Sequence, residues 1–169
     1  MNFDFPFNPF LKASFNNVKK INKNTTRFLE QNFFLYSRDG WGSLTKIDFL
    51  KKESENRIFF FNTQIQYLHD RDTWEAVQKF SKINIIDENT SIKNTLGISL
   101  DLSNKSFVET VWINSKLKRN IYDNWIFISI TPEIAMKKEY GYKADFGIFL
   151  GLEVIFAKKN QLNSFLSRY

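Results

Sequence analysis

The sequence predicts an all-β protein, an antiparallel up-and-down meander of about eight to ten strands that closes into a transmembrane-type β-barrel. Apolar and polar residues alternate along most of the chain, which puts them on opposite faces of extended strands. Short polar segments interrupt the alternation at the spacing of successive hairpins. Aromatic residues make up 17% of the 169 residues, yet no apolar run approaches the ~18 residues that a membrane helix needs.

About nine segments carry the alternation, and each is expected to be one strand. In chain order they cover residues 10–21, 25–37, 41–50, 57–69, 73–86, 91–102, 109–118, 124–136 and 144–156. The second is apolar on both faces around Phe33, so its register stays open. In the fifth, Trp74, Val77 and Phe80 also fit one face of a short helix, but we predict a strand.

Polar turns separate these segments, and no linker or change of composition divides the chain. The turns are expected at residues 22–25, 37–42, 51–56, 69–72, 87–91, 103–106, 122–124 and 137–142. Residues 1–157 are therefore expected to form a single barrel domain or the C-terminal part of a larger barrel. Residues 158–169 break the alternation and are expected to be a C-terminal tail.

The alternation alone does not tell a soluble barrel or sandwich, whose apolar face is inside, from a membrane barrel, whose apolar face meets lipid. Three features favour the membrane barrel: long runs of apolar residues at every second position of a strand, polar faces rich in amides and hydroxyls, and aromatic residues at strand ends. The expected interfacial aromatic girdle is Trp41, Trp74, Tyr122, Trp125, Tyr140, Tyr142 and Phe156. The expected lumen-lining residues are Lys46, Asp48, Gln64, Gln66, Lys93, Asp101, Glu109, Lys116, Glu133, Asp145 and Glu153.

The segment "GLEVIF" resembles the terminal-strand signal of Gram-negative outer-membrane proteins, through Gly151, Val154 and Phe156. Phe149 departs from that signal, which usually has a polar residue there, and the chain continues past Phe156. The stretches "QNFFLYSRDGWGSLTKIDF", "RIFFFNTQIQY" and "RNIYDNWIFISITPEIAMKKEYGYKADFGIFLGLEVIF" resemble the C-terminal half of a family of uncharacterised outer-membrane β-barrel proteins of Gram-negative bacteria. This resemblance implies barrel strands, location in the bacterial outer membrane and no assigned reaction.

The N-terminal residues have neither the basic nor the apolar region of a signal peptide. The strand count is also odd, whereas bacterial single-chain barrels usually have an even number. Both features are expected if the chain is a fragment of a longer barrel protein.

The sequence offers no convincing catalytic or metal site. The chain contains no Cys, which excludes disulfides, thiolate ligands and Cys nucleophiles, and its single His is His69 in a predicted loop. The net charge is +6, but the Lys and Arg residues are spread along the whole chain and interleaved with Asp and Glu, which argues against nucleic-acid binding. We therefore expect no cofactor and no enzymatic activity. The alternative left open is a barrel enzyme that acts on lipid, and it rests on His69 alone.

The predicted function is a structural or pore-like outer-membrane role. The expected partners are outer-membrane lipid, lipopolysaccharide and the barrel insertion machinery. The alternative is a soluble antiparallel barrel or sandwich that binds a hydrophobic ligand or a protein partner.

Overall fold

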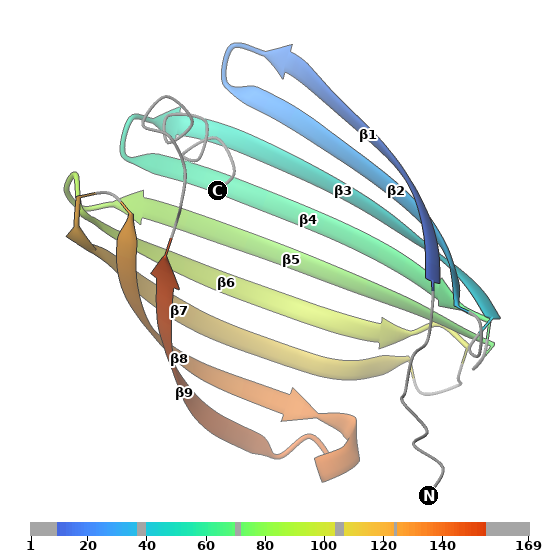
Figure 1. Ribbon diagram of the computed structural model, residues 1–169. Coiled ribbons are helices and arrows are strands. Elements are labelled where there is room, and N and C mark those ends of the chain that lie inside the picture. Colours follow the sequence, from blue (N-terminus) through green and yellow to red (C-terminus); the bar gives the residue numbers. More distant parts are fainter. Residues whose placement is uncertain (1–9, 37–39, 70–71, 104–106, 124, 155–169) are drawn as a thin grey trace, which may run out of the picture.

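The computed structural model describes residues 10–36, 40–69, 72–103, 107–123 and 125–154. Within these ranges the chain forms one antiparallel sheet of nine strands in sequence order and one short 3-10 helix (Figure 1). The elements are β1 (Phe10–Asn22), β2 (Thr25–Tyr36), β3 (Gly40–Ser54), β4 (Arg57–Leu68), β5 (Thr73–Ile85), β6 (Thr90–Asp101), β7 (Val108–Tyr122), β8 (Ile126–Lys137), η1 (Lys138–Tyr140) and β9 (Ala144–Val154). The predicted all-β meander is confirmed.

The predicted closure into a barrel is not found in the described part of the chain. Each strand pairs with its neighbours in sequence, and β1 and β9 are the two edges of the sheet. Figure 1 shows a curved, open trough with β1 at one rim and β9 at the other. Alternation reports the two faces of each strand, whereas closure depends on strand number, tilt and stagger, which alternation does not encode.

The segment with helical spacing forms a strand, as predicted. In β5, Val77 lies opposite Gln64 and Ser99, while Phe80 lies opposite Phe61 and Leu96. Val77 and Phe80 therefore point to opposite faces of the sheet, because they are an odd number of residues apart.

The outer, convex face of the trough is apolar. One row of directly opposed residues crosses seven strands, from β3 to β9: Phe49, Phe61, Phe80, Leu96, Ile113, Ile134 and Phe146. Many convex side chains are open to the surroundings, including Leu96 at 54% and Leu150 at 80% exposure. On β2 and β1 the same row continues as Arg27 and Lys19.

The inner, concave face is polar. Among the described residues, the buried polar or charged side chains are Asn32, Asp48, Asn62, Ser81, Thr95 and Lys118. The buried apolar side chains are fewer: Ile58, Tyr67, Ile83 and Ala135. The sheet thus buries polar groups and exposes apolar ones, which inverts the usual arrangement of a soluble domain.

Candidate functional site: the polar concave face

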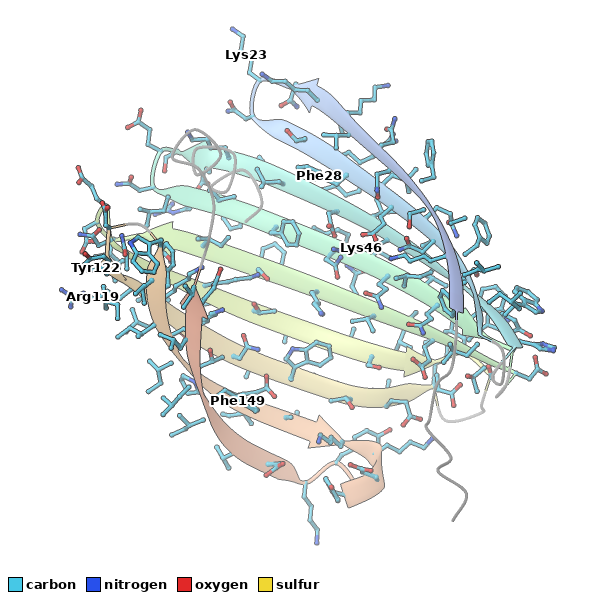
Figure 2. The ribbon with its side chains drawn as sticks, in the orientation of Figure 1. Lys23, Phe28, Lys46, Arg119, Tyr122 and Phe149 are labelled. Atoms are coloured by element: carbon cyan, nitrogen blue, oxygen red, sulfur yellow. The ribbon has the colours of Figure 1, made fainter. Side chains whose placement is uncertain are left out.

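The strand register brings together the residues expected to line a lumen. Ten of the eleven have an opposed partner, and the pairing puts all ten on the concave face. Figure 2 shows Lys46 within the trough. Glu109 lies at a β-bulge, where the β6–β7 register shifts between Ser99 and Leu100.

Hydrogen bonds between neighbouring strands connect much of this face. The Asn62 amide donates to the Asp48 carboxylate, and the Lys46 ammonium lies 3.3 Å from the same carboxylate. The Ser81 and Thr95 hydroxyls bond at 3.0 Å. These contacts satisfy side chains that burial would otherwise penalise.

On the β7–β9 side of the concave face, two side-chain contacts join β7 to β8 and β7 to β9. The Asn114 amide donates to Glu133 at 3.0 Å. The Lys118 ammonium lies 2.8 Å from Glu153 and over the Phe127 ring, 4.5 Å from its centroid.

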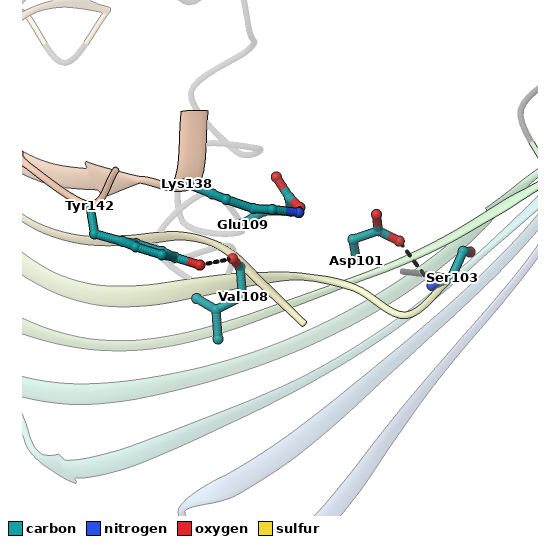
Figure 3. Close-up of polar contacts among 6 residues, drawn as sticks. All are labelled: Asp101, Ser103, Val108, Glu109, Lys138 and Tyr142. Carbon is teal, nitrogen blue, oxygen red and sulfur yellow. Dashed lines mark hydrogen bonds and ion pairs between the residues drawn. The ribbon is translucent and has the colours of Figure 1, made fainter. Parts of the chain in front are cut away.

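Polar contacts also tie the β8–β9 connection to the start of β7 (Figure 3). The Lys138 ammonium donates to Glu109 at 2.8 Å, and this hydrogen bond raises the pKa of Lys138. The Tyr142 hydroxyl donates to the Val108 carbonyl at 2.6 Å. These contacts hold η1 and the connection against the sheet.

The residues expected to form an aromatic girdle lie at both ends of the strands. At the end where β3 and β5 begin, Tyr67 lies between Trp41 and Trp74, with ring centroids 5.0 and 4.9 Å away. Tyr140 and Tyr142 follow β8 at the same end. At the opposite end, Tyr122 and Trp125 meet edge to face at 5.3 Å. Phe156 lies outside the described residues.

The expected terminal-strand signal is described only in part. Gly151 lies opposite Ser129 on the concave side of β9, and Val154 is the last residue of β9. Phe156 and the expected tail, residues 158–169, lie outside the described residues.

His69 lies in an aromatic environment. Its ring stacks on Trp41 at 5.7 Å, and its Nδ1 lies 3.5 Å from the Tyr67 hydroxyl, which donates to Asp72 at 3.1 Å. Across the described ranges, no three His, Cys, Asp or Glu side chains form a group that could hold a metal ion.

The sequence did not single out a cluster of four lysines on this face. Lys46, Lys79, Lys93 and Lys116 come from β3, β5, β6 and β7, and all are half-buried. Lys79 was missed because its segment also fitted a helix. In β5, apolar Val77 shares the concave face with Lys79 while Phe80 lies on the convex face, so no clean apolar–polar alternation marked Lys79.

Comparison with known proteins gives little on function. No protein-family model matches the chain. A protein of Candida albicans (strain SC5314) named as a putative alpha-1,3-mannosyltransferase is 29% identical over 118 residues, which cover 69% of this chain. The chain spans only 14% of that relative's length.

This match contradicts the prediction that the chain has no enzymatic activity, because the relative carries the name of a transferase. The prediction rested on the missing catalytic motif, and a local motif search does not detect a site assembled from dispersed residues. The match carries no information about an outer-membrane barrel family. Within the described residues, no helix has the length and apolar character to span a membrane.

Proposed function

We propose that the sheet is the wall of an outer-membrane β-barrel with a structural or pore-like role. In this arrangement the convex face contacts lipid and the concave face lines the lumen. The observation that supports it is the inverted polarity of the sheet, with buried Asn32, Asp48, Asn62 and Ser81 on one face and exposed Phe, Leu and Ile on the other.

The continuous convex row from Phe49 to Phe146 supports lipid contact in particular. Contiguous exposed apolar surfaces on soluble proteins mark places where a partner or membrane binds. This surface follows the curve of the sheet across seven strands, as a lipid annulus would around a barrel. The aromatic clusters at Trp41 and at Tyr122 lie at opposite strand ends, where the two lipid–water interfaces would be.

The proposal requires both edges of the sheet to be covered. Lipid offers no hydrogen-bond partners to backbone groups, so β1 and β9 must pair within the hydrocarbon region. They pair with further antiparallel strands of a larger barrel or with each other.

In the proposed orientation, β9 ends in the periplasm and the connection that contains η1 lies outside. Lys137 and Lys138 then approach the phosphates of lipopolysaccharide, to which their charge attracts them. The insertion machinery would recognise the end of β9. The location in the outer membrane and these partners are parts of the same proposal.

The alternative, a soluble barrel or sandwich, needs the convex row to be buried by another layer. Within the described residues no second layer covers it, and its side chains from Phe61 to Phe146 are exposed. This favours the membrane arrangement over the soluble one.

Detergent dependence of folding tests the proposal. The chain is refolded with and without detergent micelles, then compared by far-UV circular dichroism and by gel migration of boiled and unboiled samples. We expect β-type dichroism and a faster unboiled band only with detergent. A monomeric β protein that folds in plain buffer would overturn the proposal.

A further inference from the structure

The four lysines Lys46, Lys79, Lys93 and Lys116, here called the lysine patch, share the concave face of the sheet. Lys93 lies directly opposite Lys116 on the neighbouring strand. Lys46 is two residues from Asp48 in the same strand, and Lys79 lies opposite Asn62, which bonds Asp48.

This arrangement is electrostatically unfavourable as it stands. Like charges directly opposite each other on paired strands destabilise a sheet. Lys116, Lys79 and Lys46 repel the Lys93 ammonium, and Asp48 attracts it. Asp48 already accepts a hydrogen bond from Asn62 and pairs with Lys46, so its charge is shared between Lys46 and Lys93.

Aromatic rings, and not carboxylates, hold two of the ammonium groups. The Lys93 ammonium lies 5.6 Å from the centroid of the Phe60 ring. The Lys79 ammonium lies 6.0 Å from that of Trp112, for which Gly97 leaves room on the adjacent strand. Among the described residues, the ion pairs include no carboxylate within 4.0 Å of Lys79, Lys93 or Lys116.

We propose that the lysine patch binds a small phosphate-type oxyanion, such as phosphate or diphosphate. An anion placed among these side chains would accept charge-assisted hydrogen bonds from several ammonium groups and remove their mutual repulsion. The trough strengthens the attraction, because a cleft lined by one sign of charge focuses the field.

This site does not depend on the membrane location, since all four lysines lie on the concave face of one continuous sheet. If the proposed barrel has an open lumen, the patch makes that lumen anion-selective.

Titration of the folded full chain with inorganic pyrophosphate tests the site, with isothermal calorimetry as the measurement. The refolding conditions are those in which the chain folds, with micelles or without, so failure of the membrane proposal does not obscure the result. The variants are Lys93→Gln and Lys116→Gln. The control is Lys12→Gln, which removes the same charge from the same face on edge strand β1.

We expect saturable binding by the unmodified chain, and a weakening of about tenfold in each patch variant from the loss of a charge-assisted hydrogen bond. The Lys12 variant should bind within about twofold of the unmodified chain, because edge strand β1 lies five strands from Lys93 and six from Lys116, and salt screens charges at such separations. All variants must keep the β-type dichroism of the unmodified chain. Absence of saturable binding, or equal weakening by Lys12→Gln, would overturn the inference.

Discussion

The Lys118 ammonium lies 2.8 Å from the Glu153 carboxylate, so one ion pair joins β7 to β9 across the intervening strand β8. The Lys118 side chain is only 9% exposed, whereas Glu153 is 40% exposed. Burial on one side limits screening of the pair, and Lys118 also contacts the Phe127 ring. Removing one partner of this pair would leave a nearly buried charge, which costs more than breaking a surface pair.

Replacing Glu153 by Gln should destabilise the folded sheet by about 1–2 kcal/mol, since the nearly buried Lys118 ammonium loses its charge attraction to the Glu153 carboxylate. Urea unfolding of the refolded chain measures the change. The matched control is Glu53→Gln, which breaks the exposed Arg57–Glu53 pair at 3.0 Å and should cost less than about 0.5 kcal/mol. Equal effects of the two substitutions would contradict the role assigned to Lys118.

Gly97 is the second position at which a small change should have a large effect. A Cβ at this position would overlap the Trp112 ring on the opposite strand. Gly97→Ala should therefore destabilise the protein by about 1–3 kcal/mol through overpacking.

Gly147→Ala is the control for Gly97, because its Cβ would meet only the edge of the Phe149 ring at 3.3 Å. Its cost should be less than half that of Gly97→Ala. If Gly147→Ala destabilised the protein more than Gly97→Ala, the packing of the Trp112 ring over Gly97 would be contradicted. The measurement is again the unfolding midpoint, with near-UV dichroism to follow the Trp112 environment.

The sequence predicted the strands well because the residues of each strand report its two faces directly. The alternation of Lys46 and Asp48 against Ile47 and Phe49 is enough to assign the two faces of β3, and the strand pairing agrees with it. The register of β2 stayed open because Phe28 and Phe33 are both apolar but point to opposite faces.

Contacts between residues on different strands could not be predicted from the alternation within each strand. Nothing local indicates that Lys93 faces Lys116, because that pairing depends on the length of the connection between β6 and β7. The bulge that leaves Glu109 without an opposed residue and the absence of pairing between β1 and β9 in the described sheet could not be predicted for the same reason. Both depend on how strands are staggered against each other, and local periodicity does not contain that information.

Ile113 tests the contact of the convex face with lipid. It is 54% exposed in the middle of the apolar row, so water around it would tolerate a charge. In a bilayer, Ile113→Arg should destabilise the protein by about 2–4 kcal/mol, the cost of a cation near the hydrocarbon midplane.

Ile86→Arg is the matched control, because Ile86 is 56% exposed in the turn between β5 and β6. This substitution should change stability by less than about 0.5 kcal/mol. Unfolding in phospholipid vesicles measures both variants. Similar stabilities would mean that Ile113 does not lie in hydrocarbon.

Asp87, in the same turn, should give the stability a dependence on acidic pH. Hydrogen bonds, chiefly from the Asn89 backbone N–H, lower the pKa of Asp87 below its usual value of 3.8. A lowered pKa in the folded state means that the ionised form stabilises the fold above pH 4, and that this stabilisation is lost as the pH falls through the folded-state pKa.

Asp87→Asn removes the titrating group and keeps a side-chain oxygen as acceptor. The unmodified chain should be more stable than this variant at pH 6, and the difference should shrink as the pH falls below 4. Urea midpoints at a series of pH values measure it. A difference that grows on acidification would contradict the assigned sign.

The tryptophans can show which face of the sheet meets lipid, since Trp74 and Trp112 lie on opposite faces. Trp74 is 47% exposed beside Tyr67 on the convex face. Trp112 lies opposite Gly97 on the concave face, under the Lys79 ammonium.

The quenching experiment uses variants that keep only one of these tryptophans, with Phe at the other Trp positions. Phosphatidylcholine brominated near the headgroup end of its acyl chains should quench the fluorescence of Trp74 strongly and that of Trp112 weakly. Phosphatidylcholine of the same chain length without bromine is the control for changes in folding. Stronger quenching of Trp112 would place lipid on the polar face and contradict the proposed orientation, because contact quenching requires the bromine to touch the indole ring.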